Sequence, residues 1–183
     1  MDTRVEGVTL WAGFISDILI HYEEHRAGFA KPLFDMVENV DLSDPTRPVP
    51  MTLYNDLCRW VEQRVGPSNT KKLGIAIGNR AYGEMMRRGS FGDKITPLDI
   101  LTELKKIASV MIQDPHERGW EIVSTQMREI IMRRTQTFNC LLQEGLLRSL
   151  VERTGVKAPS IVHESCTRKG HDFCEYRVTW AVE

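Results

Sequence analysis

Two cysteines flank a short turn in the stretch Cys166-Thr167-Arg168-Lys169-Gly170-His171-Asp172-Phe173-Cys174, near the C-terminal end of the chain. Apolar and polar side chains alternate over residues 173–182, which predicts a strand that pairs with residues 156–166 across the turn. Gly170 supplies the backbone freedom that such a tight turn needs. This stretch therefore predicts a β-hairpin that brings two thiols together.

The residues before this hairpin predict the rest of a sheet. Asn139 can cap a helix over residues 140–153, and residues 120–125 and 129–135 are β-rich runs typical of a hairpin. The C-terminal half is thus expected to follow the order β-β-α-β-β. Arg133-Arg134, at the end of the first hairpin, could meet a phosphate or a propionate, although a solvated face is the default expectation for such a basic pair.

Residues 1–119 are predicted to form a helical half. Apolar residues recur there at spacings of three and four, which predicts helices over residues 8–28, 52–65, 70–88 and 97–112. Prolines at positions 45, 48 and 50 predict a loop over residues 41–50, and Gly66-Pro67 ends the second helix.

Three glycines interrupt the third predicted helix, at Gly74, Gly78 and Gly83. They lack the Gly-Lys-Ser/Thr element of a phosphate-binding loop. Close helix packing is therefore the expected reason for them.

Composition fits one domain over residues 1–183, with the helical half at 1–119 and the β-β-α-β-β half at 120–183, because 183 residues suffice for one core. The expected class is α+β, a helical half packed on a four-stranded antiparallel sheet.

The net charge of −1 argues against nucleic-acid binding. No apolar run reaches the roughly 18–20 residues of a membrane span, and residues 1–6 lack a secretory core, so we expect a cytoplasmic protein.

Three of the four cysteines fall in the C-terminal half, at Cys140, Cys166 and Cys174. Three thiols with an imidazole or a carboxylate make a closed tetrahedral set, which zinc prefers at structural sites. His163 and Glu164 lie just before Cys166 and could complete the set. Three buried free cysteines that pack as small hydrophobes are the alternative.

The run from Cys140 through Gly145 to His163-Glu164-Ser165-Cys166-x7-Cys174 resembles the 4-vinyl reductase domain family. That family includes the sensor domains of phenol-responsive activators, in a superfamily with haem–nitric-oxide-binding domains and Golgi transport-particle subunits. The resemblance covers residues 140–180 in motif and residues 1–119 in architecture only. It implies a bacterial ligand-binding protein with a structural zinc ion.

By this resemblance the zinc ligands are Cys140, His163, Cys166 and Cys174, with histidine where the phenol sensors have an acid. We prefer His163 to Glu164 because neutral imidazole suits zinc beside three thiolates. Strand alternation favours Glu164 instead, unless a bulge turns His163 to the side of Cys166.

The resemblance also implies a pocket for a small hydrophobic or aromatic ligand between the two halves. The expected lining residues combine a polar anchor with aromatic and thioether side chains: His116, Trp120, Tyr82, Met111 and Met132. A surface turn and ordinary core packing are the alternatives for these residues.

Haem is not expected, because haem relatives ligate iron from the helix that corresponds to residues 97–112, and this segment has no histidine. The haem relatives' Tyr-x-Ser-x-Arg motif is also missing, and the nearest region is residues 132–136.

The leading hypothesis is a sensory or regulatory protein with structural zinc, which signals through a homodimer or a partner protein contacted by residues 8–28. No nucleophilic catalytic set is visible, so an enzyme is not the first choice. A tetrapyrrole-related carrier or enzyme is the second hypothesis. The third is an interaction module similar to the transport-particle subunits.

Overall fold

The computed structural model describes residues 5–88, 91, 94–136 and 138–181. The helices are α1 (Gly13–Tyr22), α2 (Lys31–Asp35), α3 (Met51–Arg88), α4 (Pro97–Met111) and α5 (Cys140–Glu152). The strands are β1 (Thr9–Trp11), β2 (Pro48–Pro50), β3 (Ile112–Gln113), β4 (Trp120–Gln126), β5 (Glu129–Arg134), β6 (Lys157–Ser165) and β7 (Cys174–Ala181). No helix among the described residues is long and apolar enough to cross a membrane.

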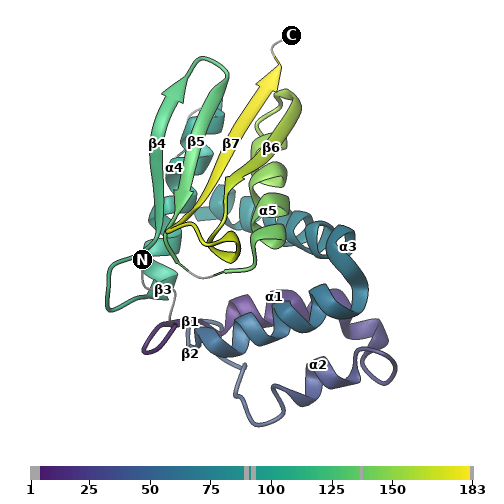
Figure 1. Cartoon of the computed structure of the whole chain (residues 1–183). Coiled ribbons are helices and arrows are strands. Elements are labelled where there is room, and N and C mark those ends of the chain that lie inside the picture. The colour runs from purple at the N-terminus through teal and green to yellow at the C-terminus, as the bar shows by residue number, and fades with distance from the viewer. Residues whose placement is uncertain (1–4, 89–90, 92–93, 137, 182–183) are drawn as a thin grey trace.

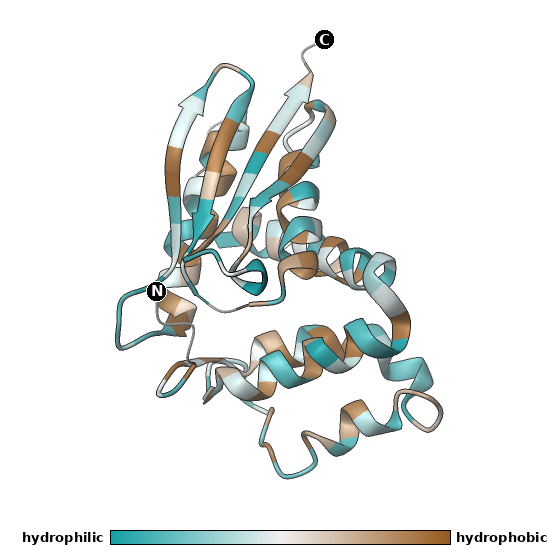
Figure 2. Cartoon of the chain, in the orientation of Figure 1, coloured by the Kyte–Doolittle hydropathy of each residue, from teal (hydrophilic) through white to brown (hydrophobic). Residues whose placement is uncertain are grey.

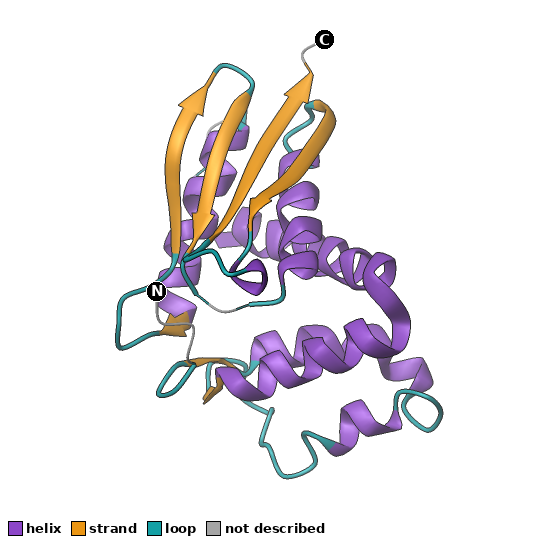
Figure 3. Cartoon of the chain, viewed as in Figure 1, coloured by secondary structure: helices purple, strands orange, loops and turns teal. Residues whose placement is uncertain are grey.

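The main sheet contains four antiparallel strands in the order β4-β5-β7-β6. Helices α4 and α5 lie against one face of this sheet, as Figures 1 and 3 show. Apolar and polar segments follow one another along the strands (Figure 2), so that Ile130, Tyr176 and Val178 are buried under the helices. The predicted α+β class and the order β-β-α-β-β are confirmed, and residue 182 of the last predicted strand lies outside the described residues.

Helix α3 joins the lower group of helices to the sheet (Figure 1). It is kinked at Gly66, whose φ of 80° and ψ of 170° are not helical, and Pro67 follows directly. Tyr54, before the kink, contacts Phe14 of α1. Gly74 and Gly78, after the kink, meet the backbone of α5. The predicted break at Gly66-Pro67 is thus observed as a kink between two helical arms.

Helix α4 begins at the residue that the sequence predicted. The Thr96 side chain accepts from the backbone N–H of Asp99, and the Asp99 carboxylate accepts from the backbone N–H of Thr96.

Two predictions for the N-terminal half are wrong. Residues 9–11 of the predicted helix 8–28 form β1, and residues 48–50 of the predicted loop form β2. Both belong to a small sheet of order β2-β1-β3, in which Leu10 pairs with Val49 and Ile112. Local periodicity could not show this sheet, because its partners are far apart in the sequence. The prolines are tolerated because β2 is an edge strand, where a missing N–H costs no ladder bond.

Candidate functional site: a Cys3His cluster beside a ligand-sized cavity

The predicted metal ligands converge although they come from three elements. Cys140 begins α5, His163 lies on β6, and Cys166 and Cys174 flank the β6–β7 turn. Their potential ligand atoms all lie within 4.8 Å of one another. The Cys140 Sγ atom lies 3.6 Å from Cys166 Sγ and 3.6 Å from Cys174 Sγ.

These distances match a tetrahedral zinc site. Two sulfurs that each lie about 2.3 Å from one zinc ion are about 3.8 Å apart at the tetrahedral angle. A disulfide would need about 2.05 Å between the sulfurs, so the 3.6 Å separations are those of free thiols. The cluster is therefore arranged as a ligand set rather than as an oxidised pair.

A bulge in β6 selects the histidine over the neighbouring acid. The register against β7 shifts between His163 and Ser165, so His163 lies on the same side as Cys166. The buried Nε2 atom of His163 has no hydrogen-bond partner in the protein. Glu164 points elsewhere, because its carboxylate accepts two hydrogen bonds from Arg177. His163 is thus available to a metal, and Glu164 is engaged on the outer face of the sheet.

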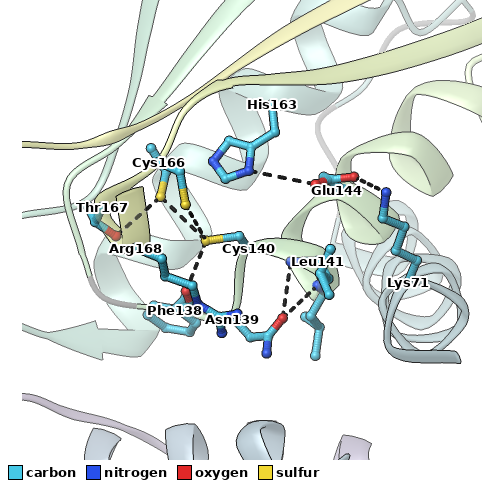
Figure 4. A network of polar contacts seen from close by, with 12 residues as sticks. Lys71, Phe138, Asn139, Cys140, Leu141, Glu144, His163, Cys166, Thr167 and Arg168 are labelled. Atoms are coloured by element: carbon cyan, nitrogen blue, oxygen red, sulfur yellow. Dashed lines mark hydrogen bonds and ion pairs between the residues drawn. The ribbon is translucent and has the colours of Figure 1, made fainter. Parts of the chain in front are cut away.

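Further contacts hold His163 in place. Its ring stacks on Tyr176 with centroids 4.5 Å apart, and its Nδ1 atom lies 3.7 Å from Glu144 Oε1. Glu144 in turn pairs with Lys71 of α3 at 2.5 Å, so the row Lys71–Glu144–His163 links α3, α5 and β6 (Figure 4). A carboxylate behind a metal-binding imidazole is a common device that orients the ring.

The electrostatics of the thiols follow from their contacts. The pKa of Cys174 falls well below its usual range, because Cys140 and Thr167 donate hydrogen bonds to its sulfur. The pKa of Cys140 rises, since it keeps the proton that it shares with Cys174 and is also buried. One thiolate is therefore favoured within the cluster before any metal binds.

A cavity of about 530 Å³ lies beside the cluster, between α1, α3, α4 and α5 on one side and β4 and β5 on the other. Its walls are mainly apolar and include Leu104, Ile107 and Leu146. The volume falls within the range of about 300–1,000 Å³ that is usual for small-molecule sites.

Only some of the predicted pocket residues line this cavity. Trp120 and Met111 line the cavity. Met132 is buried in the core, Tyr82 is half-buried on α3, and His116 is exposed in the turn after β3; these three are not among the lining residues. The sequence analysis missed Tyr54 and Arg134, which both line the cavity and are both 2% exposed. Alternation along residues 129–135 could have indicated Arg134, because it shares a face with Met132.

The similarities found to known proteins are structural. No protein-family model matches this sequence, and no curated protein matches it either. The fold is that of H-NOX proteins, the haem–nitric-oxide-binding domains. An H-NOX protein from S. oneidensis in the Fe(II)NO ligation state is 16% identical, with a TM-score of 0.65 over 92% of this chain and 98% of that one.

Two further H-NOX structures are similar. The Fe(II) unliganded protein from K. algicida is 10% identical, with a TM-score of 0.58 over 95% of this chain and 98% of that one. The protein from Shewanella woodyi in the Fe(II)CO state is 14% identical, with a TM-score of 0.57 over 92% and 94%. The expected fold is thus confirmed, whereas the 4-vinyl reductase resemblance rests on the Cys and His spacing.

The expectation against haem is wrong as it was argued, because the proteins that share this fold are recorded in Fe(II), Fe(II)NO and Fe(II)CO ligation states. The missing histidine does not exclude iron. One S. oneidensis variant in the Fe(II)CO state carries glycine in place of a histidine.

The cavity itself fits a haem group. Met85 and Met111 line it, and thioether groups ligate haem iron in proteins. Two nitrogens of the buried Arg134 have no partner in the protein, and a propionate would accept hydrogen bonds from a guanidinium of this kind.

Proposed function

We propose that this protein is a sensor domain that holds a small, largely apolar molecule in the cavity between the helices and the sheet. The observation that carries the proposal is the cavity of about 530 Å³, walled by Leu104, Ile107 and Trp120. A monomeric protein with no ligand to bind would normally fill such a space, because protein interiors are close-packed.

A zinc ion bound by Cys140, His163, Cys166 and Cys174 completes the proposal. Its role is structural, because four protein ligands leave no open coordination position for chemistry. The ion would fix the β6–β7 turn to the start of α5 beside the cavity. The ion would thereby hold the turn and α5 in fixed positions next to the ligand site.

The turn also contacts the helical half of the protein. Arg168 pairs with Glu62 of α3 at 2.9 Å, and the Asn139 amide donates to the same carboxylate at 2.6 Å. We propose that this contact transmits the state of the cavity to α3 and then to a partner protein or a second copy of the chain.

Haem is the second candidate ligand. The fold similarity to proteins in Fe(II) states favours it, together with the thioethers of Met85 and Met111 in the cavity wall. A bound haem would supply an iron centre for a diatomic gas, and the lining residues would hold and enclose it.

The direct test compares the ligand content of two variants that each introduce a tryptophan on α4. Ala108→Trp fills the cavity wall, whereas Val110→Trp lies two residues further along α4 at a position that is 63% exposed. Native mass spectrometry and the visible spectrum of the freshly purified proteins identify any bound molecule. We expect wild type and Val110→Trp to carry the same ligand and Ala108→Trp to lose it. Equal ligand content in all three proteins would contradict the proposed site.

A further inference from the structure

Arg134 is the only charged residue among the described residues that is buried as a whole, with 2% of its surface exposed. It ends β5 on the inner face of the sheet and lines the cavity. Burial lowers its pKa to about 10, which still leaves the guanidinium protonated at neutral pH. A full positive charge therefore lies in the wall of an apolar cavity.

The contacts of Arg134 leave it under-satisfied. Its guanidinium carbon lies 3.5 Å from the ring centroid of Phe138 and 4.8 Å from that of Trp120. Nη2 donates one long hydrogen bond of 3.5 Å to Gln136 Oε1, while Nε and Nη1 have no partner. The aromatic rings pack against the guanidinium and hold it in place, and two of its nitrogens remain free to donate.

Other partly buried arginines of this chain are paired with carboxylates. Arg118 pairs with Asp114 at 2.9 Å, and Arg80 pairs with Asp17 at 2.8 Å. Arg133, the neighbour of Arg134, pairs with Glu175 at 3.1 Å on the outer face. Among the described residues no carboxylate pairs with Arg134, although a buried charge has the greatest need of a counter-ion.

The metal centre does not satisfy these nitrogens. Cys174 is the cross-strand neighbour of Arg134, and zinc with three thiolates would carry one net negative charge beside it. That charge favours the guanidinium through space, yet no sulfur is within hydrogen-bond distance of Nε or Nη1. The metal centre therefore leaves Nε and Nη1 of Arg134 without an acceptor.

We propose that the ligand of this cavity carries a carboxylate that accepts hydrogen bonds from Arg134 and an apolar body that lies against α4. This inference rests on the proposed function and names the chemical class of its ligand. A single carboxylate matches the single unpaired cation. A phosphate would bring more charge, and the other cations of the lining are engaged, Arg80 by Asp17 and both Arg87 and Arg88 by Glu84.

Carboxylates of two sources share this chemistry, a free carboxylic acid and a haem propionate. Bound haem is recognised by its visible absorption and its mass, whereas a free aliphatic or aromatic acid is colourless and smaller. Native mass spectrometry of the protein as purified distinguishes them.

The test is a titration of the full chain, cleared of ligand, with dodecanoate and with dodecanol by calorimetry. The two probes share an alkyl chain and differ in the charged group. We expect wild type to prefer the acid by about tenfold to a hundredfold, because a hydrogen bond to a charged group is lost with the alcohol. Arg134→Gln should abolish this preference, Arg134→Lys should restore part of it, and the matched Arg133→Gln should keep it.

Zinc content and circular dichroism of each variant verify that the fold is intact. Equal binding of acid and alcohol by wild type, or an unchanged preference in Arg134→Gln, would overturn the carboxylate inference while leaving the cavity as a ligand site. Failure of wild type to bind either probe, with no ligand in the purified protein, would overturn both the inference and the proposed function.

Discussion

Gly74 of α3 and Gly145 of α5 lie against each other, backbone to backbone, where the two helices cross. A Cβ atom added to Gly145 would lie 3.0 Å from the Gly74 Cα and 2.1 Å from the carbonyl oxygen of Lys71. This contact brings α3 onto the helix that carries Cys140, and so places one wall of the cavity. The expectation that close packing explains the glycines is confirmed for Gly74 and Gly78, but Gly83 has open space beside it.

Gly74→Ala should lower the free energy of unfolding by about 3 kcal/mol, because its Cβ would lie 2.1 Å from the carbonyl oxygen of Leu142. Urea unfolding followed by circular dichroism measures the change. Gly83→Ala is the control, since nothing lies within 4 Å of its Cβ and alanine is the better helix former. That variant should gain about 0.5–1 kcal/mol. Similar effects of both substitutions would contradict the close crossing.

Cys174→Ser should abolish stoichiometric zinc binding and lower the free energy of unfolding by at least about 3 kcal/mol, because bound metal stabilises the folded state. Elemental analysis of the purified protein gives the zinc content. Cys58→Ser is the matched control, as Cys58 is buried on α3 outside the cluster and burial raises its pKa to about 12. Zinc retained by Cys174→Ser would remove the metal assignment.

His163→Ala should weaken zinc binding, whereas Glu164→Gln should leave it unchanged. The bulge in β6 directs His163 to the thiols, and Glu164 is held by Arg177 on the other face. Competition with a chromogenic chelator compares the affinities of the two variants. The opposite order of affinities would make Glu164 the fourth ligand.

Arg134→Met should make the ligand-free protein more stable by about 1–3 kcal/mol, because it removes a buried charge that has no carboxylate partner and two unpaired nitrogens, while keeping an apolar side chain of similar length. Chemical denaturation after removal of bound ligand tests this sign. A residue with only a structural role would destabilise the protein when replaced. A marked loss of stability in Arg134→Met would therefore show that the guanidinium is already satisfied within the protein.

Asp17 predicts a pH dependence with a defined sign. Burial raises its pKa above the usual 3.8, although the neighbouring Arg80 partly opposes this. A carboxyl whose folded pKa exceeds its unfolded pKa contributes its stability below pH 3.8 and loses it as the pH rises through the folded value. Asp17→Asn should thus gain stability relative to wild type as the pH increases from about 3 to 7. Urea midpoints of both proteins measured across this pH range test the prediction. A difference between the two midpoints that stays constant with pH would refute it.

Local signals in the sequence were sufficient for much of the C-terminal half. The alternation over residues 173–182, the Asn139 cap and the Gly170 turn each act through neighbouring residues, and the strands and α5 formed where they indicated. The cysteine spacing likewise indicated one cluster. The small sheet of β1, β2 and β3 gave no such signal, because its strands gain stability only from distant partners.

The sequence alone determined which side chains could bind a metal and in what order the elements follow one another. Only the tertiary structure decided that His163 rather than Glu164 faces the thiols, because a one-residue bulge reverses the faces of a strand. It also decided that Arg134 is buried and unpaired while Arg133 is only partly buried and pairs with Glu175. The burial of a side chain and its ion-pair partner depend on elements that are distant in the sequence and adjacent in the fold. A local sequence pattern therefore does not predict them.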